Sequence, residues 1–219
     1  MRIPGSNSYH AAALFAAVVA AFTGCAGKQD KYASPVPRED LAEYRQVAAD
    51  AHRVVQAALT SLDRATAQTP CPPRMVRAFA KDVRRLEVHS FRLRARAQAI
   101  RERGNDYFEQ WHQHLQHVKD PAARQRAVAR RERLQERFDH IRLLTQDARE
   151  AFQPFLAGLH RVRNGLERNP GLASTDAMKE TIRTTRENGK KVEASIGSVL
   201  GELDAVAVIL RPDKNPKKG

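Results

Sequence analysis

The sequence predicts an all-α protein that folds as an elongated antiparallel four-helix bundle with coiled-coil-like packing. Apolar residues recur at alternating spacings of four and three residues through four long segments, as in helices that pack in coiled coils. Gly and Pro, at 11 each in 219 residues, are too few for the many tight turns of an all-β chain. Two Cys residues exclude a scaffold held together by several disulfides.

The first helix is expected over residues 38–67. All eight positions of the spacing, from Leu41 to Ala65, carry apolar side chains. The Pro-rich stretch 68–73 ends this helix, because Pro lacks the backbone N–H and restricts the residue before it.

The second helix is expected over residues 73–118. Ten of its thirteen positions in the spacing are apolar. The exceptions are Ser90, Gly104 and His114. An alternative is a break at residues 104–106, after which acidic side chains of the next turn would cap a new helix.

The third helix is expected over residues 121–168, because Asp120 can cap its first turn and Pro121 suits its first position. Ten of the twelve positions in the spacing are apolar. The exceptions are Arg131 and Thr145. Pro154 lies inside this helix and is expected to kink it.

The fourth helix is expected over residues 175–210, between the Asn-Pro-Gly stretch 169–171 and Pro212. Eight of its ten positions in the spacing are apolar. At a rise of 1.5 Å per residue, the two central helices would each be roughly 70 Å long. The expected bundle domain therefore covers residues 38–210, followed by a basic disordered tail over 211–219.

The N-terminal residues resemble a lipoprotein signal peptide. Arg2 precedes an apolar run at residues 11–22, which is shorter than the roughly 20 residues that a membrane-spanning helix needs. The run leads into Phe-Thr-Gly before Cys25, which resembles the lipobox of bacterial lipoproteins. We therefore expect a signal peptide at 1–24, lipidation of Cys25 and a flexible tether within 25–37. The alternative is an ordinary secreted protein with a cysteine near its cleavage site.

The resemblance to bacterial lipoproteins also predicts a location. Several acyl chains hold a protein firmly to a membrane, whereas a single one binds only marginally. Ala26 follows the cysteine where Asp would signal retention in the inner membrane, so it favours the outer membrane, facing the periplasm. The expected location is the bacterial cell envelope.

The charge of the chain is strongly basic and unevenly distributed. The 38 Lys and Arg residues outnumber the 25 Asp and Glu residues, which gives a formal net charge of +13. Five basic residues of the second helix recur at spacings of four and seven, offset from its apolar positions, and we expect them to point outward. These residues are Lys81, Arg85, Arg92, Arg96 and Arg103. This stripe is expected to be either a solvated face or a surface that binds anionic lipid or an envelope polymer rather than nucleic acid.

Few residues suggest chemistry. Cys71 in the Pro-rich loop is expected to be exposed, where it could form an intermolecular disulfide or remain an unpaired thiol. His114 and His117 share a helix face, so they could supply two metal ligands or be polar residues at a helix end. Phosphate-binding and hydrolase motifs are absent, so we expect no enzyme activity, no metal site and no cofactor.

Residues 108–203 resemble a family of bacterial lipoproteins known only as a domain of unknown function. The resembling elements are Phe108-x-x-Trp111, Arg137-Phe138, Pro154-Phe155-Leu156 and Leu166-x-x-Asn169. The family has a Lys-His pair where this chain has Glu167-Arg168. The resemblance implies a lipoprotein with long coiled-coil helices and implies no activity.

These observations together predict a non-enzymatic, membrane-anchored envelope lipoprotein that acts as a coiled-coil scaffold or spacer. The alternative is a peripheral binder of anionic membrane or polymer surfaces through the outward basic stripe. Self-association through the apolar positions is also open, because such positions drive oligomers as well as bundles.

Overall fold

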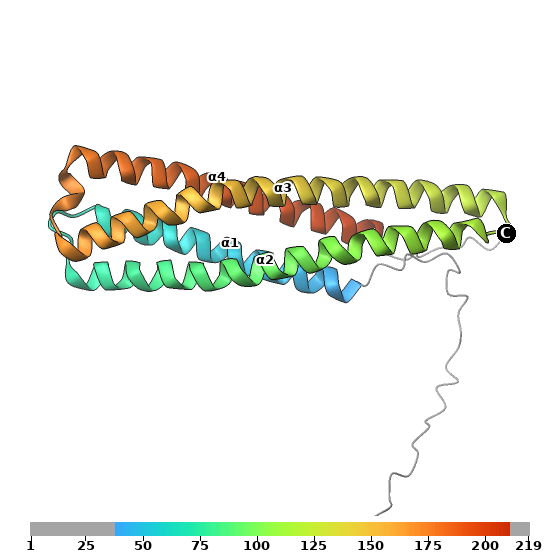
Figure 1. Cartoon of the computed structure of the whole chain (residues 1–219), viewed down its shortest axis with the longest axis horizontal. Coiled ribbons are helices and arrows are strands. Elements are labelled where there is room, and N and C mark those ends of the chain that lie inside the picture. Colours follow the sequence, from blue (N-terminus) through green and yellow to red (C-terminus); the bar gives the residue numbers. More distant parts are fainter. Residues whose placement is uncertain (1–37, 211–219) are drawn as a thin grey trace, which may run out of the picture. The chain divides into compact units, whose positions relative to one another are not determined.

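The computed structural model describes residues 38–210 and shows an all-α helical bundle, as the sequence predicts. The helices are α1 (Arg38–Thr66), α2 (Pro73–Gln116), α3 (Pro121–Arg168) and α4 (Asp176–Ile209), with a 3-10 helix η1 (Leu172–Ser174) before α4 (Figure 1). The predicted signal peptide, the lipidated Cys25 with its tether and the predicted tail lie outside the described residues. Within 38–210 there is no strand.

The predicted helix boundaries agree with the structure to within two residues, because local chemistry defines them. At the start of α3, the Asp120 side chain accepts a hydrogen bond of 2.9 Å from the Ala122 N–H, and Pro121 follows it as the first helical residue. The alternative break at residues 104–106 is wrong, since α2 continues through them. Helix α3 likewise continues through Pro154, and a kink there stays a prediction.

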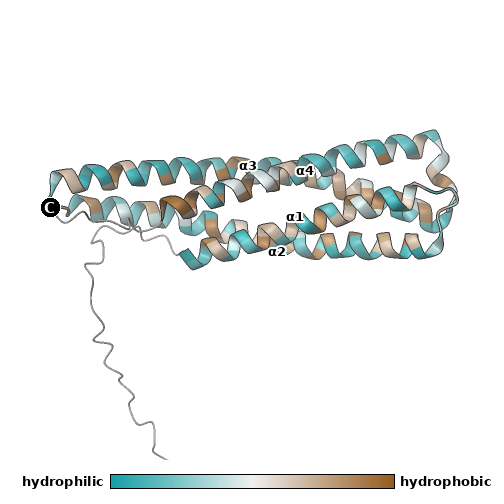
Figure 2. Cartoon of the chain, turned by 180° about the vertical axis from the view of Figure 1, so that it is seen from behind, coloured by the Kyte–Doolittle hydropathy of each residue, from teal (hydrophilic) through white to brown (hydrophobic). Residues whose placement is uncertain are grey.

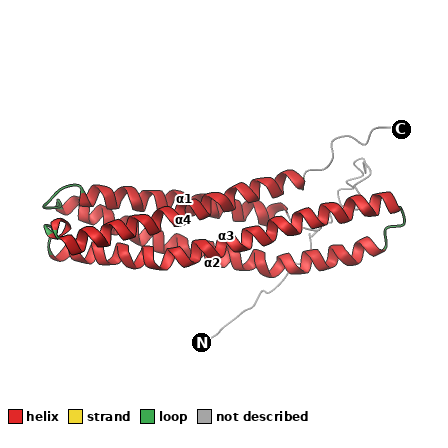
Figure 3. Ribbon diagram, turned by 90° about the horizontal axis from the view of Figure 1, so that it is seen from above, coloured by secondary structure: helices red, strands yellow, loops and turns green. Residues whose placement is uncertain are grey.

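Consecutive helices lie side by side and are joined by short loops at two ends of the bundle (Figure 3). Three contacts define how α1 lies against α4: residue 45 with 204, residue 56 with 193, and residue 63 with 186. Residue numbers rise along α1 as they fall along α4, so these two helices run in opposite directions. The coiled-coil character of the packing stays a prediction.

The apolar spacing defines the core. Of the predicted core positions in all four helices, every one except His114 is buried or half-buried. Polar residues cover the outer surface, so hydrophilic and hydrophobic residues alternate along each helix (Figure 2). At one end, the two neighbouring loops meet where the Cys71 N–H donates a hydrogen bond of 2.9 Å to the Pro170 carbonyl.

Candidate functional site

A groove with a volume of about 1120 Å³ lies between α2 and α3 in the described part of the bundle. Of the neighbouring helices, α2 and α3 contact each other least, so this side of the bundle is the most open. All four helices line the groove. Its floor is apolar and comes from α1 and α4: Ala48, Ala51, Val55, Val192, Ile196 and Val199.

Small residues at core positions open this groove. In α2, Ser90, Ala97 and Gly104 recur every seven residues, and all three line the groove. In α3, Thr145 and Ala148 are small residues at core positions that also line the groove. A larger side chain at each place would bridge the two helices, as a packed core requires. The exceptions to the apolar spacing in these two helices therefore mark the groove, with His114 the only one outside it.

Two hydroxyl groups line the groove beside this floor, and both have hydrogen-bond partners. The Thr145 hydroxyl donates a hydrogen bond of 2.7 Å to the Ile141 carbonyl. Its oxygen lies 3.2 Å from the Tyr44 hydroxyl, which must then be the donor of that pair. Burial raises the pKa of Tyr44, and the hydrogen bond to Thr145 offsets part of this effect. The phenol therefore stays protonated across the physiological range.

The rim of the groove is rich in arginine. Helix α2 contributes Arg94 and Arg101, and α3 contributes Arg131, Arg142 and Arg149. Three of these side chains have partners: Arg94 lies over the Phe91 ring, Arg131 donates to the Phe108 carbonyl and Arg142 pairs with Asp139. Arg101 and Arg149 have no acidic partner among residues 38–210. Glu109, Asp139 and Glu150 also line the groove, so five arginines stand against three acidic residues beside an apolar interior.

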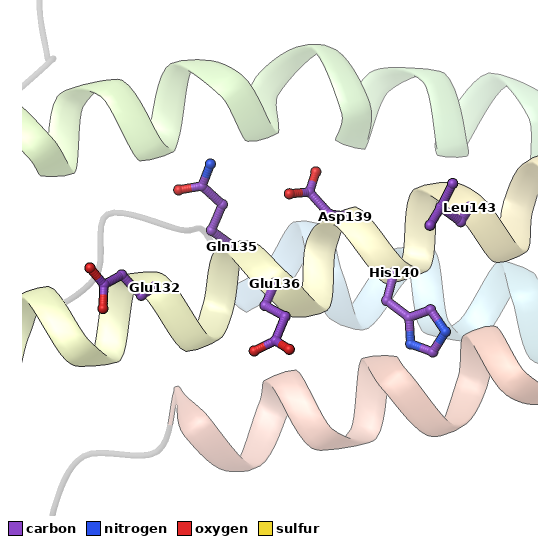
Figure 4. A pocket seen from close by; sticks show the side chains of 6 residues that line it. All are labelled: Glu132, Gln135, Glu136, Asp139, His140 and Leu143. Carbon is purple, nitrogen blue, oxygen red and sulfur yellow. The ribbon is translucent and has the colours of Figure 1, made fainter.

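Exposed apolar side chains also gather on these two helices. Phe91 is 66% exposed on α2 and Leu143 is 56% exposed on α3, and both are large enough to be expected in a core. Val88 on α2 is also exposed. On α3, Leu143 lies near a shallow depression with acidic and amide side chains on both sides of the helix (Figure 4).

This shallow depression is a solvated surface rather than a pocket. Glu132, Glu136 and Asp139 line it, but no group of three potential metal ligands occurs among residues 38–210. His140 at its edge is bonded instead to Glu202 of α4 at 3.0 Å. Burial raises the pKa of Glu202, and the hydrogen bonds from Arg137 and His140 outweigh this, so its pKa is lowered overall.

Charge is divided sharply between the two sides of the bundle. The segment 73–168, which contains α2, α3 and the loop between them, carries 22 Lys and Arg against 12 Asp and Glu. Helices α1 and α4 together carry 9 basic against 11 acidic residues. We call the outward surface of residues 73–168 the α2–α3 face. The net positive charge of the described bundle is therefore carried by the segment whose two helices flank the groove.

The predicted basic stripe divides into two parts. Lys81, Arg85 and Arg92 are exposed, as an outward stripe requires. The outward orientation expected for Arg96 is wrong, because its side chain is only 17% exposed and pairs with Asp40 at 3.0 Å and Glu43 at 2.5 Å.

Arg103 is half-exposed, and it pairs with the same Asp40 at 2.7 Å. The last two arginines of the stripe therefore lie against the start of α1. Only the first three remain available to a partner, because the charge of the other two is already neutralised within the bundle.

The expected exposure of Cys71 is also wrong. Its side chain is free but 1% exposed, and burial raises the pKa of the thiol. The side chain packs in a buried hydrophobic cluster, which makes an intermolecular disulfide at this position unfavourable. Cys25 lies outside the described residues. His114 and His117 lie at the end of α2, where the backbone N–H of His117 donates to the His114 carbonyl.

Comparison with protein-family models, curated proteins and solved structures finds no match to the chain. The resemblance to a lipoprotein family therefore stays a prediction. Among the described residues, no helix is long and apolar enough to cross a membrane. The groove was not predicted from the sequence. The small residues at every second core position of α2 from Ser90 to Gly104 are the signal that could have indicated it.

Proposed function

We propose that this chain is a non-enzymatic lipoprotein of the bacterial envelope whose helical bundle binds anionic membrane or polymer surfaces through the α2–α3 face. The observation that carries the proposal is the division of charge, with 22 basic against 12 acidic residues in segment 73–168 and no such excess in α1 and α4. A face of one charge attracts a surface of the opposite charge and orients the molecule on it.

The available arginines support surface binding. Arg85 and Arg92 of α2 and Arg133 of α3 are exposed, and none of them is in an ion pair with another described residue. Each basic residue near an anionic membrane surface contributes about 1 kcal/mol of attraction. The exposed Phe91 and Leu143 add apolar area that can enter the headgroup region beside these charges. Acylation of Cys25 would hold the bundle close to such a surface.

A scaffold or spacer role is the second candidate, and the length of the central helices favours it. Helices α2 and α3 contain 44 and 48 residues, so each is roughly 70 Å long. A lipid-anchored bundle of that length could hold a partner at a fixed distance from the membrane. Association through apolar contacts would persist in high salt, whereas binding to anionic headgroups would weaken.

Co-sedimentation with vesicles tests the surface proposal. The chain from residue 26 onward, which lacks Cys25, is mixed with anionic or neutral vesicles over a salt series. We expect it to pellet with anionic vesicles only and to be released as salt rises, because added ions screen exposed charges. A triple variant, Arg85→Gln, Arg92→Gln and Arg133→Gln, should bind on the order of 100-fold more weakly.

A second triple variant provides the matched control. Arg53→Gln, Lys190→Gln and Lys191→Gln remove the same charge from exposed positions on α1 and α4. This control should pellet nearly as well as the unchanged chain. Equal losses in both variants would show that net charge alone matters. No pelleting with anionic vesicles at low salt would contradict the proposal and favour the spacer.

A further inference from the structure

We infer that the groove between α2 and α3 binds one acyl chain that carries an anionic headgroup, such as a monomeric fatty acid. The groove reaches from the outside of the α2–α3 face to buried side chains of α1 and α4, including Val55 and Ile196. Its volume of about 1120 Å³ is at the upper end of small-molecule sites. This inference concerns a monomeric ligand inside the bundle and goes beyond binding to a surface.

The dimensions of the groove suit an acyl chain. From Ser90 to Gly104 the α2 wall spans 14 residues, which is roughly 21 Å at the helical rise. One leaflet of a membrane has a hydrocarbon thickness of roughly 15 Å, so an extended acyl chain fits with room for its headgroup.

A docked helix fits poorly. Packed helices lie about 8–10 Å apart, so a helix about 10 Å wide has no room between α2 and α3, which contact each other. The floor also lies between helices of the same bundle, where a fifth helix would have to separate α2 from α3. The groove dimensions therefore favour a single flexible chain over a helical partner.

The floor presents no unpaired polar group to such a chain. The Tyr44 hydroxyl donates a hydrogen bond to the Thr145 hydroxyl, which in turn donates one to the Ile141 carbonyl. The Ser90 hydroxyl donates to the Glu87 carbonyl at 2.7 Å. An acyl chain over this floor would therefore leave the existing hydrogen bonds intact, which avoids the cost of burying an unpaired polar group.

The rim indicates the charge of the headgroup. A contact between Glu87 and His160 and the approach of Gly104 to Phe138 fix the register of α2 against α3. In this register, Arg101 lies at the level of Arg142, and Arg94 lies near the level of Arg149. Like charges across a groove repel each other, and a carboxylate or phosphate between them would offset that repulsion. Of the rim arginines, Arg101 and Arg149 are those without another partner in residues 38–210.

Fluorescence titration with cis-parinaric acid, a straight-chain fatty acid that fluoresces in apolar sites, tests the inference on the chain from residue 26 onward. We expect saturable binding, displacement by palmitate, and little displacement by hexadecyltrimethylammonium, which has the same chain length and the opposite charge. Ala97→Phe and Ala148→Phe fill the groove and should each weaken binding at least about tenfold. Ala157→Phe, at an exposed α3 position outside the groove, should leave it unchanged.

Charge variants test the headgroup separately from the groove. Arg101→Gln and Arg149→Gln should each weaken parinarate binding by about fivefold. Arg124→Gln removes the same charge from an exposed α3 position outside the groove and should have little effect. If both Phe variants lose their helical circular dichroism, the comparison of the three arginine variants tests the inference instead. Equal parinarate affinities in all three arginine variants would overturn it.

Other outcomes would also overturn the inference. These are no saturable binding, unchanged binding in folded Ala97→Phe and Ala148→Phe, or displacement by the cation as effective as by palmitate. If the unchanged chain binds no parinarate and forms a dimer that Ala97→Phe dissociates, the groove would instead be the contact with a second copy of the chain. Vesicle pelleting of Ala97→Phe separates the two proposals, because a filled groove leaves the exposed arginines in place and surface binding should persist.

Discussion

At the scale of single residues, glycine allows the helices to pack closely. A Cβ atom at Gly189 of α4 would lie 2.6 Å from Leu59 Cδ2 and 2.6 Å from Phe155 Cε2. At Gly158 of α3, it would lie 2.0 Å from the Thr185 hydroxyl oxygen. These side chains are in the buried core and cannot move freely. The two glycines are therefore needed for close contact, although each lowers helix propensity.

Alanine at Gly189 should destabilise the bundle, because the added methyl group overpacks the core. We expect Gly189→Ala to lower the free energy of unfolding by about 1–3 kcal/mol, measured by urea denaturation. Gly201→Ala on the same helix is the control, since its Cβ would meet nothing within 4 Å. The control should raise stability by up to about 1 kcal/mol, as helix propensity alone predicts. A stabilising effect of both changes would show that α4 lies farther from Phe155.

At the scale of elements, polar contacts to α2 hold the start of α1. Asp40 receives hydrogen bonds from Arg96 at 3.0 Å, Arg103 at 2.7 Å and Tyr107 at 3.2 Å. The hydrogen bond from Arg103 is the main reason that the pKa of Asp40 is lowered, and burial opposes it. The carboxylate also lies in the first turn of α1, where the helix dipole favours negative charge.

The contribution of Asp40 to stability should depend on pH. Because its folded pKa is below the ordinary value of 3.8, the charged form stabilises the bundle above that pH. This contribution is lost as the pH falls through the folded pKa. Asp40→Asn should therefore lower the thermal midpoint at neutral pH, and its difference from the unchanged chain should shrink in acid. Asp147→Asn is the control, at an exposed acid of α3 without an ion pair in the described bundle. A pH-independent difference for Asp40→Asn would contradict the account.

The helices could be predicted from the sequence, whereas the site could not. Helix ends depend on neighbours in sequence, such as the cap by Asp120, and the core follows the apolar spacing. The burial of Arg96 depends on an acid 56 positions away, and the burial of Cys71 depends on a loop near Pro170. The place of a residue along its own segment does not reveal which other part of the chain covers its side chain. The groove requires the register of α2 against α3, which the spacing within each helix leaves undetermined.

At the scale of the whole bundle, charge is distributed unevenly. Helices α3 and α4 pack most extensively, and the α1–α4 side is nearly neutral with paired charges such as Arg45 with Asp204. The α2–α3 side is more open, strongly basic and carries exposed Phe91 and Leu143. The basic α2–α3 side is therefore the surface that we propose an anionic partner contacts.

The orientation of the bundle on an anionic surface is the most direct test of this account. An environment-sensitive fluorophore is attached through Gln98→Cys on α2 or through Ser198→Cys on α4, both exposed positions, in the chain from residue 26 onward. Buried Cys71 should remain unlabelled. With anionic vesicles at low salt, we predict increased fluorescence from the α2 label, reversal by salt and no change from the α4 label. A larger response from the α4 label, or equal responses from both, would contradict the assignment of the α2–α3 face as the binding surface.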